Sequence, residues 1–381
     1  MENTARWDRR RFLGAATAVG AAAAGLAACT GGAGDDLAGE VAGERNLPAI
    51  EWDLPTSWPA SLDTIYGGAV TFAERVTALT GGRFRISARE GGELVPPLEV
   101  LQSVQGGGIP AGHTAAYYYV GLSPVTAFGT ALPFGLTYRE QNAWLYQAGG
   151  LEMLQEFYAD TFNLIQFPAG NTGAQMGGWF NRQVNSVADL QGLRMRTAGL
   201  AAQVLGKLGV TVQTLPGAEI FQALQTGAID AAEWVGPYDD LKLDFPAVAR
   251  NYYYPGWWEP GPSLEVQISL DEWNRLPSIY QDVVRAAARE ANVDMMARYD
   301  FQNTQAMQEL AANPNVQLLP FPGDVMDAAQ NASFELFDEL SASDARFREI
   351  YGQWSTFRGS IHSWFGVAER SFLDYATAPP S

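Results

Sequence analysis

The pattern that most constrains the fold is an alternation of strand-like and helix-like segments, which runs once and then starts again after residue 170. In the first run, strand-like segments over 50–58, 84–87 and 113–120 are separated by helical patterns over 65–79 and 97–105. A β-α-β-α-β order of this kind predicts a parallel sheet with right-handed crossovers.

The second run predicts another α/β unit, and several helices follow it. Its strands are expected over 176–181, 193–196 and 210–215, and its helices over 199–208 and 218–226. A strand leading to Glu233 closes this unit, and residues 266–270 read as a strand that returns to the first one. Helical patterns then cover 277–312, 325–341 and 345–375.

Two α/β units, repeated crossing of the chain between them and one very long helix predict a specific architecture. This is a two-lobed, hinged, periplasmic-binding-protein-like α/β fold with a long interlobe helix. About 330 residues follow the N-terminal segment, more than one hydrophobic core usually holds. The expected parts are lobe I over 49–173 plus 260–300, lobe II over 174–259 plus 301–343, and a C-terminal helix over 344–381.

The N-terminal residues have the pattern of an export signal. Arg9-Arg10-Arg11-Phe12-Leu13 fits a twin-arginine motif, although Asp8 stands where Ser or Thr is usual, and an uncharged Ala-rich stretch follows. Leu26-Ala27-Ala28-Cys29 matches a lipobox, in which the cysteine is acylated after cleavage. We therefore expect a signal over 1–28, lipidation at Cys29, and a Gly-, Ala- and Asp-rich tether over 29–48. Such a protein would be periplasmic and held at the membrane by its lipid anchor.

Composition excludes several classes of function. The chain has 42 acidic and 24 basic side chains, which argues against nucleic acid or an anionic membrane surface as a partner. Cys29 is the only cysteine, so neither an intrachain disulfide nor a buried thiol nucleophile is available. His113 and His362 are the only histidines, which disfavours a serine hydrolase or a zinc enzyme. A carboxylate-pair glycosidase is not excluded by composition, but no motif supports one, so we expect no enzyme.

Glu233 is the most informative candidate site residue. In the strand-like run 228–237, period-2 alternation places Glu233 on the same face as the apolar Ile229, Ala231 and Val235. The position lies at the carboxyl end of the strand, where ligands bind in open α/β sheets. Because an unpaired carboxylate there is costly, a cation or a hydrogen-bonded ligand should meet it, unless the side chain turns to solvent.

Several longer motifs, in order along the chain, carry a family resemblance. Asp-Leu-Gln-Gly-Leu-Arg-Met-Arg (189–196) and the second α/β unit resemble the extracytoplasmic solute receptors of TRAP transporters. The runs 173–180, 216–220, 231–237 and 253–261 resemble the subgroup that binds 2-oxo acids and lactate. The resemblance covers essentially everything after residue 48. It implies capture of a small organic acid, such as a pyruvate- or lactate-like monocarboxylate, for delivery to TRAP membrane permease subunits.

Arg194 and Arg196 alternate to the same side of their strand, so from the residues alone either could face the cleft. A guanidinium offers a rigid fork of donors that matches a carboxylate. In the resembled family the last Arg of this run holds the ligand carboxylate, which points to Arg196.

A second group of candidates consists of oxygen donors, which suit hard cations such as Na⁺ or Ca²⁺. In the resembled subgroup a metal ion bridges such ligands to the substrate, which implies roles for Gln175, Glu233 and the backbone of Trp234. Glu259 is a further expected ligand, but its motif is written Trp-Trp-Glu here, at a place where the family varies.

Tyr117, Tyr118 and Tyr119 end the third predicted strand, where phenol groups could wall the site and donate to an oxygen. Alternation sends Tyr117 and Tyr119 to one side and Tyr118 to the other, so not all three can reach the ligand.

The C-terminal helical segment carries a wide apolar stripe. Its members are Phe347, Ile350, Trp354, Phe357, Ile361, Trp364, Phe365 and Phe372. The stripe either packs back on its own lobe or pairs two protomers in a homodimer.

The chemical nature of the ligand stays open at the level of sequence. The same pocket chemistry suits a receptor for an aromatic carboxylate or for a sugar-derived ligand. It also suits an exported ligand sensor, which differs from a transport receptor only in the membrane protein to which it docks.

Overall fold

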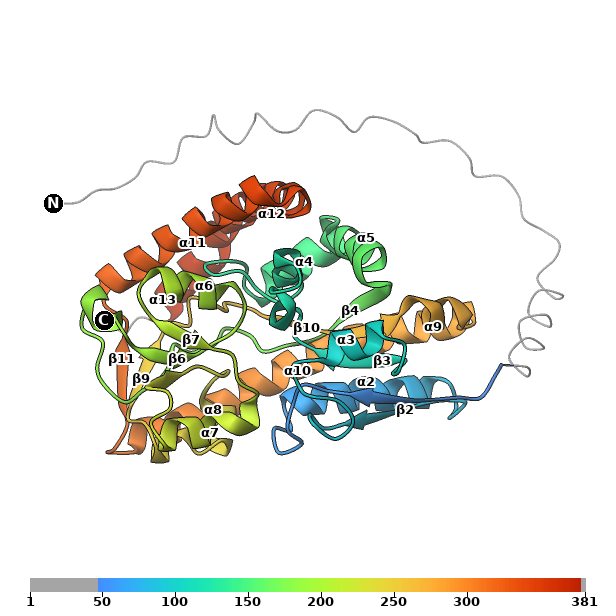
Figure 1. The fold of residues 1–381 in the computed structure, drawn as a ribbon, viewed down its shortest axis with the longest axis horizontal. Coiled ribbons are helices and arrows are strands. Elements are labelled where there is room, and N and C mark those ends of the chain that lie inside the picture. The colour runs from blue at the N-terminus through green and yellow to red at the C-terminus, as the bar shows by residue number, and fades with distance from the viewer. Residues whose placement is uncertain (1–46, 378–381) are drawn as a thin grey trace. The chain divides into compact units, whose positions relative to one another are not determined.

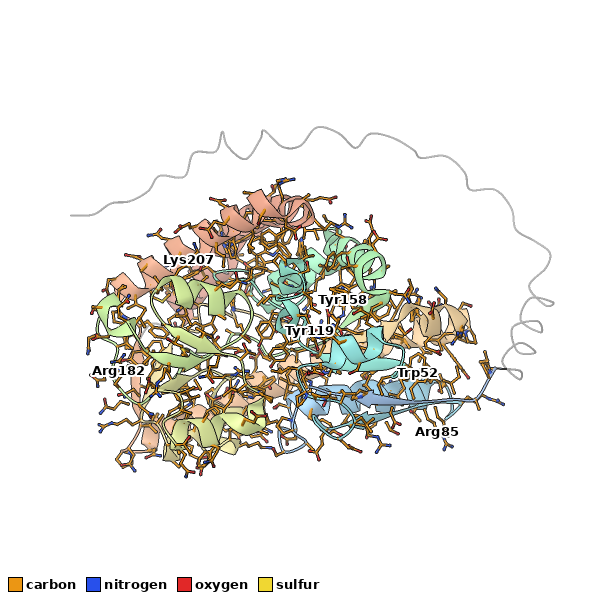
Figure 2. All side chains as sticks on the ribbon, in the orientation of Figure 1. Trp52, Arg85, Tyr119, Tyr158, Arg182 and Lys207 are labelled. Atoms are coloured by element: carbon orange, nitrogen blue, oxygen red, sulfur yellow. The ribbon has the colours of Figure 1, made fainter. Side chains whose placement is uncertain are left out.

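The structure is a computed structural model that describes residues 47–377 (Figure 1). The predicted signal, the predicted lipidation site at Cys29 and nearly all of the predicted tether lie outside the described residues. In the described part, no helix is long and apolar enough to cross a membrane. Charged side chains such as Arg182 and Lys207 lie at the periphery, and aromatic ones such as Tyr119 and Tyr158 lie in the interior (Figure 2).

Five strands form the first sheet region. They are β1 (Ile50–Pro55), β2 (Phe84–Arg89), β3 (Ala111–Thr114), β4 (Leu164–Asn171) and β10 (Ser263–Ser269). β1 and β2 pair in parallel, and a parallel bridge between Thr56 and His113 connects this pair to β3. β10 lies between β3 and β4 and is antiparallel to both. The helices of this region are α2 (Ile65–Leu79), α3 (Val100–Gln105), α4 (Tyr138–Gln147), α5 (Gly150–Phe162) and α9 (Leu270–Arg275).

Two details of the predicted first sheet are wrong. The sheet is mixed, because the returning strand β10 inserts antiparallel at its centre. The strand expected over 113–120 ends at Thr114, and Ala116–Tyr119 forms the 3₁₀-helix η2. The pairing of β10 with β3 stops at the Glu265–Thr114 pair, so the residues beyond Thr114 have no strand to bond with despite their high β-propensity.

The second sheet has six strands in the order β11-β9-β5-β8-β6-β7. They are β5 (Gly178–Phe180), β6 (Arg194–Arg196), β7 (Thr211–Gln213), β8 (Ala231–Ala232), β9 (Asn251–Tyr254) and β11 (Gln317–Pro320). β5 is antiparallel to both neighbours, and the other adjacent pairs are parallel. Helices α6 (Gly199–Lys207), α7 (Gly217–Gln225) and α8 (Pro237–Lys242) connect strands of this sheet; the second α/β run predicts the first two of these helices but not α8.

The predicted long helix is confirmed as α10 (Ser278–Ala312), with 35 residues. Pro277 precedes its first turn, and Asn313-Pro314 follows its last one, as expected for helix boundaries. α10 packs against α2 and β4 of the first region and against α8 of the second (Figure 1). The helix therefore spans both sheet regions.

The C-terminal helices contact both sheet regions (Figure 1). They are α11 (Gly323–Ser343), α12 (Ala345–Phe365), a π-helical turn η6 (Gly366–Arg370) and α13 (Ser371–Ala376). In the first part of the apolar stripe, Phe347, Ile350 and Trp354 are buried in the core of their own chain. In its last part, Trp364 and Phe372 are 58% and 66% exposed. Short 3₁₀-helices occur at η3 (Pro124–Gly129), η4 (Val187–Leu190) and η5 (Phe245–Ala247).

Candidate binding site

Four segments meet at one edge of the second sheet. Arg196 is the last residue of β6, and Glu233 directly follows β8, the parallel neighbour of β6, so these two side chains begin at adjacent strand ends. Gln175 precedes β5, which runs the opposite way, and therefore lies at the same edge. Glu259 lies in the loop after β9, and its main-chain carbonyl accepts a 3.1 Å hydrogen bond from the main-chain N–H of Gln175. The topology thus brings together residues that are far apart in sequence.

Arg196 and Glu233 form a buried ion pair. Nη1 of Arg196 lies 2.5 Å from Oε1 of Glu233 and also donates to the Glu233 carbonyl at 2.8 Å. Nε of Arg196 donates to the Leu215 carbonyl at 3.1 Å, and its Cζ lies 5.0 Å from the centre of the Trp234 ring. The two side chains are 1% and 0% exposed. Nη2 of Arg196 has no hydrogen-bond partner within residues 47–377, so one arm of the fork remains free for a ligand.

Arg194 is separated from the site. It pairs with Asp230 at 2.6 Å, and its side chain is 44% exposed. Of the two arginines that alternation left open, the structure therefore places only Arg196 among the buried candidate residues.

Three buried oxygen atoms at this edge have no hydrogen-bond partner in the described part of the chain. They are Oε1 of Gln175, Oε2 of Glu233 and Oε1 of Glu259. The other polar atoms of two of these side chains are engaged: Nε2 of Gln175 donates to Thr172 at 3.1 Å, and Oε2 of Glu259 accepts from Tyr117 at 3.5 Å. An orphaned buried acceptor costs free energy, so the arrangement favours a bound group that contacts all three oxygens.

The charges at this edge are unbalanced. Burial raises the pKa of Glu259 well above its usual range, and the neighbouring Glu233 raises it further. Burial also raises the pKa of Glu233, and the nearby Arg196 opposes that shift. Two carboxylates with one guanidinium call for a further proton or cation.

The donor set fits a hard cation. The residues described by the structure contain no group of three His, Cys, Asp or Glu side chains able to hold a metal. The set at this edge is of another kind, with two carboxylates and an amide oxygen, the oxygen chemistry that Na⁺ and Ca²⁺ accept. Gln175, Glu233 and Glu259 would hold such an ion. The predicted contribution of the Trp234 backbone stays a prediction.

The three tyrosines divide differently from the predicted alternation. Tyr117 and Tyr118 both line the cavity at this edge, with ring centres 5.0 Å apart. Burial raises the pKa of Tyr118 to about 12, so it is a neutral hydroxyl group. Tyr119 points away into the core, where its hydroxyl accepts from the Leu101 amide at 3.1 Å and lies 2.9 Å from Oγ1 of Thr114. The 3₁₀ turn, not a strand, produces this division.

The cavity itself is small and walled by aromatic rings, with an empty volume of about 250 Å³. Trp58 and Trp234 meet across it with ring centres 6.4 Å apart. Trp58 is not among the residues predicted from the sequence, although its place just before Pro59 at the end of a strand-like run is a usable signal. Nε1 of Trp58 donates to Nδ1 of His113 at 2.8 Å, and burial lowers the pKa of His113 to about 4, which keeps the imidazole neutral. His113 thus orients a wall of the cavity.

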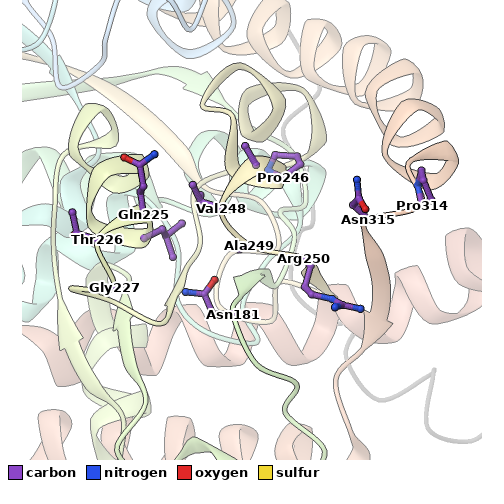
Figure 3. A pocket seen from close by; sticks show the side chains of 12 residues that line it. Asn181, Gln225, Thr226, Gly227, Pro246, Val248, Ala249, Arg250, Pro314 and Asn315 are labelled. Atoms are coloured by element: carbon purple, nitrogen blue, oxygen red, sulfur yellow. The ribbon is translucent and has the colours of Figure 1, made fainter.

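A larger hollow, with an empty volume of about 1350 Å³, lies elsewhere (Figure 3). It is lined by residues such as Asn181, Thr226, Arg250 and Asn315, which come before β8, β9 and β11 or after β5. These positions belong to the opposite end of the second sheet from Glu233. The hollow shares no lining residue with the aromatic cavity, so size alone does not identify the site.

The fold is that of a solute-binding protein. Residues 56–344 match the family described as bacterial extracellular solute-binding protein, family 7 (DctP), and the chain belongs to that family. This confirms the family expected from the sequence motifs and the expectation that the protein is not an enzyme.

Individual relatives are similar over nearly the whole chain. A monocarboxylate 2-oxoacid-binding periplasmic protein of Nostoc sp. is 52% identical over 335 residues, which cover 88% of this chain and 91% of the relative. A TRAP transporter solute-binding protein from Bordetella bronchiseptica, solved as a dimer with calcium and picolinate, is 43% identical with a TM-score of 0.85. The match covers 86% of this chain and 97% of that one.

A third relative is a TRAP periplasmic solute-binding protein from Pseudoalteromonas atlantica, solved with sodium and pyruvate. It is 35% identical with a TM-score of 0.82, and the match covers 85% of this chain and 98% of that one. These likenesses confirm the two-lobed fold expected from the sequence.

Proposed function

We propose that this chain is the receptor of a TRAP transporter for a small 2-oxo or 2-hydroxy monocarboxylate, such as pyruvate or lactate. The observation that carries the proposal is the set of unpartnered oxygens of Gln175, Glu233 and Glu259 beside the free Nη2 of Arg196. A ligand carboxylate would take the free arm of the guanidinium. A cation would be coordinated by the three protein oxygens together with the carboxylate and 2-oxygen of the ligand.

Charge supports the cation in this proposal. An anionic ligand would add a third negative group to Glu233 and Glu259, against the single positive charge of Arg196. When bound, Na⁺ or Ca²⁺ would supply the missing positive charge and accept neutral and anionic oxygens alike. The relatives solved with calcium and picolinate and with sodium and pyruvate are consistent with this assignment. Tyr117, Tyr118 and the two indoles would exclude water and enclose the apolar end of the acid.

The test is a thermal-shift and calorimetry panel on the purified protein, with and without metal stripping. Pyruvate with Ca²⁺ at about 100 times its Kd should stabilise the protein by about 2.7 kcal/mol. Propionate is the matched control, because it keeps the carboxylate and the chain length but lacks the 2-oxygen. Binding of pyruvate that is unaffected by metal stripping, or equal binding of propionate, would contradict the proposal.

An aromatic carboxylate is the second candidate. Picolinate, held by the Bordetella bronchiseptica relative, also places a donor atom next to its carboxylate, and Trp58 and Trp234 would flank its ring. Including picolinate in the same panel decides between the two, since the preferred ligand has the lower Kd in the presence of metal.

The location and delivery steps belong to the same proposal. We infer export by the twin-arginine signal, lipid anchoring at Cys29 and delivery of the acid to membrane permease subunits, in keeping with an extracellular family. Cys29→Ser should release the protein from membrane fractions, and replacement of Arg9 and Arg10 by Lys should block export. A Cys29→Ser protein that stays in the membrane fraction would contradict the anchor.

Domain division and association are also proposed. The lobes expected over 49–173 plus 260–300 and 174–259 plus 301–343 each contain one sheet region, which supports that division. A homodimer through residues 344–381 is supported by the exposed Trp364, Phe372 and Tyr375 and by the dimeric Bordetella bronchiseptica relative. Light scattering should give a dimer mass for the full chain and a monomer mass when Trp364 and Phe372 are replaced by Ser. A monomer mass for the full chain at high concentration would contradict the dimer.

A further inference from the structure

Asp239 is a buried carboxylate next to the site that the proposed binding scheme does not use. It lies on α8, is fully buried, and accepts hydrogen bonds from three side chains. Oδ1 accepts from Oγ1 of Thr64 at 2.5 Å. Oδ2 accepts from the Tyr299 hydroxyl at 2.7 Å and from Nε1 of Trp234 at 3.3 Å.

The three donors come from three different parts of the fold. Thr64 directly precedes α2, which packs on β2 and β4 of the first sheet region. Tyr299 lies on α10, the helix that spans both regions, and Trp234 follows β8 at the binding edge of the second sheet. Asp239 is therefore the point at which the first region, the long helix and the binding edge are joined by hydrogen bonds.

Trp234 connects this junction to the Arg196–Glu233 pair. Its ring packs on the Arg196 guanidinium at 5.0 Å and meets Trp58 of the first region at 6.4 Å. The Nε1 bond to Asp239 fixes the rotation of the indole, and with it the surface that Arg196 and the ligand contact. The Thr64 bond forms only when the segment before α2 lies against α8.

Exposed contacts accompany the buried one. Lys242 of α8 lies 2.5 Å from Asp63 and donates to the Ser61 carbonyl at 3.2 Å, and the Tyr238 hydroxyl donates to Asp63 at 3.2 Å. Exposed pairs of this kind contribute little. The buried Thr64–Asp239 bond is the contact with a large effect, because breaking it leaves a carboxylate oxygen unsatisfied in the interior.

We propose that Asp239 is a positioning residue. It couples closure of the Thr64 segment onto α8 to the orientation of Trp234 beside the Arg196–Glu233 pair. The ligand is then held tightly only when the Thr64 bond is made. This inference rests on the function proposed above.

Thr64→Val is the decisive variant, because it removes the hydroxyl and keeps the shape. In the described structure the Thr64 side chain makes no capping bond to α2, so the helix start is not the target of the change. Pyruvate affinity with Ca²⁺ should fall about 10-fold or more, the size expected when a hydrogen bond to a charged group is lost. The loss should lie mainly in a faster dissociation rate, measured by stopped-flow tryptophan fluorescence. Thr64→Ser should restore the wild-type rate.

Asp240→Asn is the matched control. Asp240 is the adjacent residue on α8, is equally buried, and accepts from Trp179 at 3.0 Å and Tyr252 at 2.7 Å, both within the second sheet. This variant should lose stability in urea unfolding and keep the wild-type dissociation rate. Asp239→Asn should lose both.

The outcomes separate the two proposals. A wild-type protein that does not bind pyruvate or picolinate contradicts the proposed function. A wild-type protein that binds, beside a Thr64→Val variant with the same affinity and dissociation rate, overturns the coupling. Equal loss of affinity in Asp240→Asn would also overturn it, because the effect would then be general destabilisation of α8.

Discussion

Nη1 of Arg196 lies 2.5 Å from Oε1 of Glu233 at the ends of two adjacent parallel strands, and both side chains are shut off from solvent. A buried pair of this kind is seldom a net gain in stability, because removing both charges from water costs about as much as their attraction returns. Its value lies in placing a guanidinium with one free arm next to a carboxylate with one free oxygen. In the proposed function, that arrangement would hold an anion and a cation side by side.

Replacing Arg196 by Lys should separate charge from geometry. The ammonium keeps the charge opposite Glu233 but loses the fork and the bond to the Leu215 carbonyl. Affinity for pyruvate should fall by about 1.5–3 kcal/mol in calorimetry, the range for charge-assisted hydrogen bonds. Arg194→Lys is the control, since Arg194 forms a partly exposed pair with Asp230. Equal affinities for the two variants would rule out a role of the Arg196 guanidinium in holding the ligand carboxylate.

Glu233→Gln should abolish the metal dependence of binding as well as most of the affinity. The variant keeps the size of the side chain but removes the charge that a cation needs and the partner of Arg196. The measurement is a calorimetric titration of pyruvate at several Ca²⁺ concentrations. Asp230→Asn, which breaks the surface pair with Arg194, should titrate like the wild type. A Glu233→Gln protein that still requires Ca²⁺ would place the cation elsewhere.

The adjacent tyrosines should respond differently to loss of the hydroxyl. Tyr118→Phe should weaken ligand binding with little effect on stability, because the lost hydroxyl belongs to a residue that lines the cavity and neighbours Arg196. Tyr119→Phe should lower the free energy of unfolding by about 1–3 kcal/mol and leave affinity unchanged, because it orphans the Leu101 amide in the core. Chemical denaturation and calorimetry on both variants check this. Loss of affinity in Tyr119→Phe together with loss of stability in Tyr118→Phe would contradict this division of the two residues.

Glu265 should make stability depend on pH. It is buried on β10, where its Oε1 accepts from Tyr158 at 2.6 Å and Gln267 at 2.7 Å, and burial raises its pKa from 4.5 to about 7. A raised pKa means that the folded state holds the proton more tightly than the unfolded state. The contribution is therefore complete below about pH 4.5 and is lost as the pH rises through about 7.

The shift of the Glu265 pKa from 4.5 to about 7 sets the size of this effect. It corresponds to about 3 kcal/mol of unfolding free energy between low and high pH. Glu265→Gln imitates the protonated form, so it should reduce the fall in unfolding free energy between about pH 5 and pH 8. Urea unfolding at both pH values measures the difference from the wild type. Identical pH profiles for variant and wild type would show that the carboxyl group does not titrate in this window.

The site residues that were predicted from the sequence differ in a consistent way from those that were missed. Arg196, Glu233, Gln175 and Glu259 belong to contiguous motifs that resemble those of a known family, and that resemblance selected them. Thr64, Trp58 and Asp239 have contact partners on distant segments, such as the Thr64–Asp239 bond across 175 residues. Trp58 has a local signal in its place before Pro59, but no local pattern shows the partners of Thr64 and Asp239.

The sequence by itself determined the elements whose signals are local. α2 and α10 follow from apolar spacing together with the glycines and prolines at their ends, and the second α/β unit follows from its alternation. Tertiary structure alone decided the rest. β10 enters the first sheet antiparallel, the tyrosine run becomes a 3₁₀ turn, and Asp239 joins three segments. A strand exists only where a partner offers its backbone, and a buried charge is tolerated only where donors converge, and both conditions are set by residues distant in sequence.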